Sequence, residues 1–120
     1  MANHDSDLLA LRDLIREFAA ERDWHKFHTP KNLSMALTVE VAELAEHFQW
    51  LPTGASDELP NEQRGEIRQE LADVLVYLIR LADKLDVDLY SAVIDKMALN
   101  RLKYPADKVR GDSRKYTEYD

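Results

Sequence analysis

The sequence contains no cysteine, only three glycines, and no run of apolar residues long enough to span a membrane. Without cysteine the chain forms no disulfide and no thiolate metal site, so a bound metal would need oxygen or nitrogen ligands. The first residues, Met1 to Asp5, have neither the basic start nor the apolar segment of a secretory signal. These absences predict a cytoplasmic protein with no membrane partner.

Positive charge is also scarce, because 16 Lys and Arg residues stand against 23 Asp and Glu residues and the net charge is −7. General binding to DNA or RNA depends on neutralising phosphates with Lys and Arg, so we expect no nucleic-acid partner. With 120 residues, 45% of them hydrophobic, the chain has the size of one compact core. We therefore predict a single domain over residues 1–120, in which the polar segment 106–120 is a tail or lid.

Apolar residues recur at helical intervals in four segments, and capping residues mark their ends. The spacing predicts helices over residues 5–22, 29–50, 60–85 and 88–105. Thr29 followed by Pro30, and Asp88 alone, are typical N-terminal signals of a helix. Residues 51–59 carry turn formers without periodicity and are expected to form a connector. The pattern predicts an all-α fold, a four-helix bundle.

The third predicted helix is apolar almost all round between Val74 and Ile79. A helix of that kind is normally buried on most sides, and four helices of this length can hardly enclose one of their number. A second copy of the chain would provide the missing cover. We therefore predict a bundle completed by self-association, as a homotetramer or, alternatively, a dimer.

Two pairs of acidic residues lie within the apolar stripes of the second and third helices. Glu40 pairs with Glu43, and Glu70 pairs with Asp73. Residues three apart share a face of a helix, and like charges that close repel each other unless a cation or a proton lies between them. Two such helices facing each other would form a cage of carboxylate oxygens, which suits Mg²⁺ or, alternatively, Mn²⁺.

Three other interpretations of these acids have to be weighed. An exposed rim of charge would give such pairs by chance, because 32% of the residues are charged. A di-iron bundle requires a His three residues after a Glu, but His47 falls four residues after Glu43, so we set it aside. A noncatalytic bundle that binds a structural cation or a partner protein stays open as an alternative.

Five segments of the chain carry a resemblance to a known family: FHTPKNL (27–33), EVAELAEHFQW (40–50), ELADVLVYLIRLAD (70–83), KMALNRLKYP (96–105) and GDSRKYTE (111–118). The chain resembles the all-α nucleoside triphosphate pyrophosphohydrolases of the MazG-like superfamily, most of all their small dCTP pyrophosphatase branch. The resemblance implies Mg²⁺-dependent hydrolysis of a nucleoside triphosphate between its α and β phosphates, releasing a monophosphate and pyrophosphate. The motifs favour dCTP or 5-modified dCTP, with a broad-specificity house-cleaning enzyme as the alternative.

The resemblance also implies roles for individual residues. The four acids match the metal ligands of the family, and either Glu40 or Glu43 would also activate the attacking water. Lys and Asn at the positions of Lys96 and Asn100 contact the nucleotide phosphates or sugar in the family. Lys115 and Tyr116 in the tail would close as a lid. The resemblance assigns recognition of the base to four rings: Trp24, His28, Trp50 and Tyr77.

Overall fold

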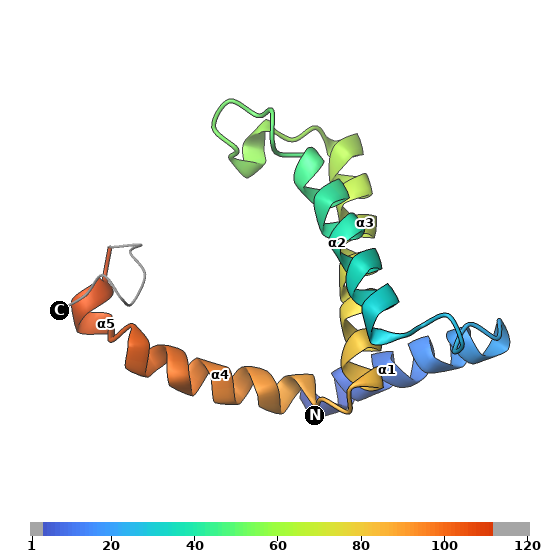
Figure 1. Cartoon of the computed structure of the whole chain (residues 1–120). Helices are drawn as coiled ribbons and strands as arrows, with labels where there is room; N and C mark the ends of the chain where they lie inside the picture. Colours follow the sequence, from blue (N-terminus) through green and yellow to red (C-terminus); the bar gives the residue numbers. More distant parts are fainter. Residues whose placement is uncertain (1–3, 112–120) are drawn as a thin grey trace. The chain divides into compact units, whose positions relative to one another are not determined.

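The computed structural model describes residues 4–111, and the regular elements within that range are helices joined by loops and turns (Figure 1). It contains no strand among these residues, so the predicted all-α class is confirmed. None of the described helices is both long enough and apolar enough to cross a membrane. The elements, in chain order, are α1 (His4–Glu21), α2 (Pro30–Glu46), the 3-10 helix η1 (Ser56–Glu58), α3 (Asn61–Lys84), α4 (Leu89–Lys103) and α5 (Ala106–Val109).

The predicted helix starts are confirmed at two caps. The Thr29 hydroxyl accepts a hydrogen bond from the backbone N–H of Asn32 at 3.2 Å, and Pro30 occupies the first turn of α2. The Asp88 carboxylate accepts from the N–H of Ser91 at 3.1 Å and begins α4 in the same way. Each cap satisfies a backbone donor that the first turn of a helix leaves free.

The predicted end of α2 at Trp50 is wrong, because the helix ends at Glu46 and residues 47–50 form turns. The N–H of His47 bonds to the carbonyl of Leu44 at 3.3 Å, and that of Phe48 bonds to Ala45 at 3.0 Å. These bonds span three residues, so the chain tightens here although the apolar stripe runs on to Phe48. η1 and α5 are short helices in segments where no periodicity predicts one.

The chain divides into two compact units, residues 1–87 and residues 88–120. The second unit contains α4 and α5, whose large side chains Val93, Ile94 and Leu102 are exposed. The prediction of one domain over the whole chain stays a prediction.

In the first unit, α2 packs along α3, and α1 packs against α3 as well (Figure 1). Leu33 of α2 is only 1% exposed. The other buried apolar side chains of this unit are Ile67, Ile79 and Ala82 of α3 and Ala19 of α1. Burial of these apolar side chains holds the three helices together.

Other apolar residues of α3 remain at the surface of the single chain. Leu71 is 53% exposed, and Leu75, Val76 and Leu78 are each about 40% exposed. Exposed apolar area of this extent favours association with another surface. Self-association stays a prediction.

Candidate functional site

The four predicted metal ligands lie on the two helices that pack together, and we call them the acidic cluster: Glu40 and Glu43 of α2, Glu70 and Asp73 of α3. Glu40 is half-buried, and its pKa is raised by burial first and then by the charges of Glu43, Asp73 and Glu70. The carboxylates of α2 and α3 therefore lie close enough for their charges to interact across the contact between the two helices.

Within residues 4–111, no three Asp, Glu or His side chains converge closely enough to form a metal site as they are placed. The assignment of the acidic cluster as metal ligands stays a prediction. One atom of the cluster nevertheless fits a cation. Oε2 of Glu70 is buried and has no hydrogen bond among the described residues, and a buried carboxylate oxygen without a partner carries a large desolvation cost.

His47 is the neighbour of that oxygen, and sequence reasoning missed it. Its Nε2 lies 2.7 Å from Oε2 of Glu70, although the contact is too poorly directed to count as a hydrogen bond. The side-chain amide nitrogen of Gln63 lies 3.0 Å from Nδ1 of His47 and 3.4 Å from the His47 carbonyl oxygen. An amide that donates to Nδ1 leaves the imidazole proton on Nε2. His47 and Gln63 thus hold the end of α2 against the acidic face of α3.

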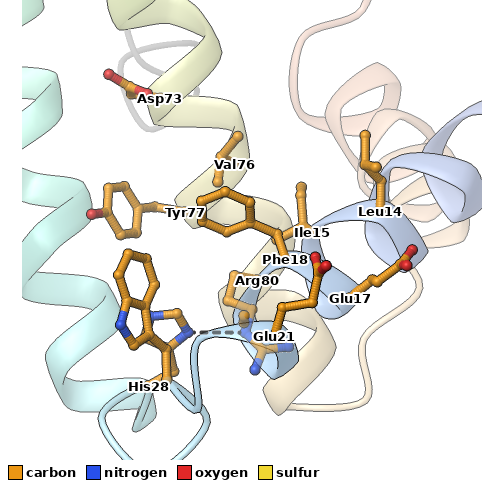
Figure 2. A pocket seen from close by; sticks show the side chains of 12 residues that line it. Leu14, Ile15, Glu17, Phe18, Glu21, His28, Asp73, Val76, Tyr77 and Arg80 are labelled. Carbon is orange, nitrogen blue, oxygen red and sulfur yellow. Dashed lines mark hydrogen bonds between the residues drawn. The ribbon is translucent and has the colours of Figure 1, made fainter.

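A cavity of about 600 Å³ lies beside the acidic cluster, between α1, the loop that follows it and α3 (Figure 2). Asp73 belongs both to the acidic cluster and to the wall of this cavity, so the two regions meet at that carboxylate. Trp24, His28 and Tyr77, three of the four predicted base-binding rings, also line the cavity. The complete lining is Leu14, Ile15, Glu17, Phe18, Ala19, Glu21, Trp24, His28, Asp73, Val76, Tyr77 and Arg80.

The end of α1 places Trp24 in this wall. Asp23 adopts a left-handed conformation with φ of 54°, which reverses the chain. The N–H of Trp24 then bonds to the carbonyl of Ala19 at 2.9 Å, and that of Asp23 to Ala20 at 3.1 Å, as in a Schellman motif. The apolar contact typical of this motif is made by the rings of Trp24 and Phe18, which meet edge to face with centroids 5.7 Å apart.

His28 is placed by the loop that continues from Trp24. Its N–H bonds to the carbonyl of Trp24 at 3.2 Å, and the two rings lie 6.0 Å apart, edge to face. The amide of Asn32 donates to the carbonyl of Phe27 at 3.0 Å and ties the loop to the first turn of α2. Two helix ends therefore fix the positions of both rings.

Arg80 is the second residue that sequence reasoning missed. Its side chain is only 3% exposed, and its Nε donates to Nδ1 of His28 at 3.1 Å (Figure 2). Its other nitrogens reach Nδ1 of His25 and, at 3.5 Å, a carboxylate oxygen of Asp83. Arg16 of α1 pairs with both oxygens of Asp83, at 2.5 and 3.0 Å. We call these five residues the arginine network.

One predicted site residue lies outside the cavity lining, and two others lie in the second unit. Trp50 follows α2 in a turn, is 86% exposed and is not part of the cavity lining. Lys96 and Asn100 lie one turn apart on α4, in the second unit, where Lys96 is exposed and Asn100 is half-buried. Their roles stay predictions. The predicted lid residues Lys115 and Tyr116 lie outside the described residues.

Comparison with known proteins places this chain in a family. The MazG-like family model matches residues 35–119. The chain is 51% identical over 110 residues to dCTP pyrophosphatase 1 of Homo sapiens and 49% identical over 114 residues to the Bos taurus protein of that name. These matches cover 90% of this chain and 65% of each relative, so the chain spans about two thirds of the length of the curated relatives it matches.

A solved structure extends the likeness to three dimensions. A pyrophosphatase from Archaeoglobus fulgidus is 44% identical in sequence and superimposes with a TM-score of 0.74, over 88% of this chain and 95% of the archaeal one. The family match includes all four acids of the acidic cluster as well as Tyr77 and Arg80. The chain belongs to the MazG-like family.

Proposed function

We propose that the protein hydrolyses a nucleoside triphosphate between the α and β phosphates, releasing a nucleoside monophosphate and pyrophosphate, with dCTP or 5-modified dCTP as the preferred substrate. The observation that carries the proposal is that Asp73 belongs both to the wall of an aromatic cavity and to a group of carboxylates from two packed helices. A base in the cavity would bring its phosphates to the acidic cluster. The names of the two mammalian relatives support dCTP as the substrate.

We assign Mg²⁺, with Mn²⁺ as the alternative, to Glu40, Glu43, Glu70 and Asp73. The buried, unbonded oxygen of Glu70 and the mutual repulsion felt by Glu40 support this assignment, because hard cations prefer carboxylate oxygens. When bound, the metal neutralises charge on the phosphates and lowers the pKa of a bound water. His47 and Gln63 would keep Glu70 in place, as the neighbours of metal ligands commonly do.

The remaining steps belong to residues of the chain. Glu40 or Glu43 would orient the attacking water and accept its proton, because these carboxylates lie together at the edge of the cluster. Trp24 and Tyr77 would hold the base between apolar ring faces, and His28 would hydrogen-bond to it. Trp50, Lys96 and Asn100 are proposed to complete the base and phosphate contacts, on the family resemblance alone.

We further propose that the protein acts in the cytoplasm as a homotetramer, with a dimer as the alternative, and that it needs no nucleic-acid or membrane partner. The exposed apolar side chains of α3 support association between copies of the chain.

Product analysis tests this function. The purified protein is incubated, with and without Mg²⁺, with each common ribo- and deoxynucleoside triphosphate and with 5-methyl-dCTP. We expect monophosphate and pyrophosphate, dependent on Mg²⁺, at the highest rate from dCTP or its 5-methyl form. Equal rates with many bases would replace this assignment by a broad-specificity enzyme. No turnover would support the noncatalytic alternative.

A further inference from the structure

Arg80 is a hydrogen-bond donor to His28, a residue whose neutral ring can carry its proton on either of two nitrogens. A neutral imidazole carries its single proton on either Nδ1 or Nε2, and the partner of one nitrogen decides the other. A guanidinium can only donate, so a ring nitrogen that contacts it must accept. Nε of Arg80 donates to Nδ1 of His28 at 3.1 Å, and this leaves the ring proton on Nε2.

The surroundings of His28 also keep its ring neutral. Burial lowers the pKa of His28 first, and the charges of Arg80, Lys84 and His25 lower it further. The acidic side chains of the cavity wall are Glu17, Glu21 and Asp73. None of the three is among the groups that shift this pKa. At neutral pH the ring therefore has one proton, and Arg80 determines where it is.

Arg80 is itself held in one orientation. Its side chain is 3% exposed, and the carboxylate of Asp83 lies 3.5 Å from Nη1. Arg16 of α1 donates hydrogen bonds to both oxygens of the Asp83 carboxylate. Because the guanidinium is planar and its donors are rigidly placed, fixing it at Asp83 and His25 also fixes the donor that meets His28.

We propose that Arg80 is a positioning residue that makes His28 a dedicated Nε2–H donor to the base in the cavity, and that this donor selects a base with an unprotonated ring nitrogen. Cytosine has such a nitrogen at N3, whereas N3 of uracil and thymine carries a proton and presents a donor instead. Two donors facing each other leave both unpaired, which is the kind of mismatch that gives strong discrimination. The proposed selection of the base rests on the proposed function of the cavity, whereas the proposed Nε2–H form of His28 does not.

The first test reads the histidine directly. Long-range ¹H–¹⁵N NMR spectra of the imidazoles distinguish the two neutral forms, and His28→Gln assigns the His28 signals among the four histidines of the chain. We expect His28 of the wild-type protein in the Nε2–H form at neutral pH. A wild-type ring protonated on Nδ1, or on both nitrogens, would overturn the proposal whatever any variant does.

The second test removes the positioning residue. Arg80→Met keeps an unbranched apolar stem and removes the guanidinium donors, and Arg68→Met removes an exposed charge from the same helix as a matched control. We expect Arg80→Met to give a mixture of both neutral forms at His28, while the His47 signals and the Arg68→Met spectrum stay as in the wild type. If Arg80→Met does not fold, Arg80→Lys, which keeps the charge without the fixed fork of donors, takes its place, with the same expected change at His28.

The third test measures selectivity by equilibrium binding of the product monophosphates dCMP and dUMP in calorimetry, which needs no turnover. We expect the wild type to prefer dCMP and Arg80→Met to reduce that preference by about tenfold, the value of one hydrogen bond. An unchanged preference, or none in the wild type, would overturn the proposal. Preference for dCMP without hydrolysis of any triphosphate would instead defeat the proposed function and leave the role of Arg80 standing.

Discussion

Helix α3 carries two groups of charged residues that are arranged in opposite ways. Glu70 and Asp73 lie close enough to Glu40 of α2 for their negative charges to raise its pKa, whereas Arg80 and Asp83, two to three turns later, are paired within the arginine network. The first group has an oxygen with no partner, and the second uses its donors and acceptors on each other. On the proposed function, the paired charges of the arginine network support the structure, whereas the carboxylates of the acidic cluster bind the metal.

The pKa shifts express the same contrast. In the acidic cluster the pKa of Glu40 is raised, by burial and by its acidic neighbours, so the ionised form is disfavoured. In the arginine network the pKa of Asp83 is lowered, by its hydrogen bond with Arg16 above all, so the ionised form is favoured. On the proposed function, an added cation would favour the ionised form of Glu40, whereas the cations that favour ionised Asp83 are already present as Arg16 and Arg80.

The largest expected effect comes from removing a charge from the acidic cluster. Glu43→Gln and Asp73→Asn should each reduce turnover of dCTP by about 100-fold or more, because each removes a ligand charge and keeps the side-chain shape. Steady-state kinetics, together with circular dichroism and size-exclusion chromatography, measure the effect. Glu62→Gln, an exposed acid in the first turn of α3, is the matched control. Turnover close to that of the wild type in either site variant would show that the acidic cluster is not the metal site.

Adding Mg²⁺ should have the next largest effect, on the stability of the protein. At about 100 times its Kd, Mg²⁺ should raise the free energy of unfolding of the wild type by about 2.7 kcal/mol. Asp73→Asn should respond much less, because it leaves only three of the four carboxylates of the acidic cluster. Thermal unfolding with and without MgCl₂ measures this, with NaCl at equal ionic strength as the control. Equal stabilisation by both salts would mean general screening rather than binding.

His47 contacts Glu70 of the acidic cluster without forming a well-directed hydrogen bond. His47→Ala should weaken the affinity for Mn²⁺ by about tenfold or more, since Glu70 loses the neighbour that holds it in place. Calorimetric titration with Mn²⁺ gives the affinity, and Glu46→Gln, an exposed neighbour, serves as the control. Unchanged affinity for Mn²⁺ would mean that His47 only stabilises the end of α2 and does not hold Glu70 for the metal.

The smallest effect is expected in the arginine network. Arg16→Met should lower stability only slightly, because Arg16 is half-exposed, and the loss should depend on pH. Asp83 has a folded-state pKa below its ordinary value of 3.8, so its pairing stabilises the fold above that pH and is lost as the pH falls through the folded-state value. Urea unfolding of both proteins from pH 7 to pH 3 should show the difference shrinking at the acid end. A difference that grows on acidification would contradict this assignment.

The sequence predicted helix type and helix starts well, because apolar spacing, Thr29 and Asp88 act through residues close in the chain. It also located the acids, which stand out as charges in an apolar stripe. It missed the end of α2, where short-range bonds at His47 overrule the stripe. It missed Arg80 because the partners of Arg80 come from another part of the chain, although a lone Arg within an apolar stripe was a usable signal.

The loop that carries Trp24 and His28, two of the proposed base-binding rings, lies between two helix caps. It begins at the left-handed residue Asp23 and ends at the cap Thr29, and both ends are parts of helices packed in the same unit. The loop is held by backbone bonds, from Trp24 N–H to the Ala19 carbonyl and from His28 N–H to the Trp24 carbonyl, so substituting a side chain leaves these bonds in place. On the proposed function, we expect substitutions between residues 24 and 28 to change substrate preference more readily than a change in loop length.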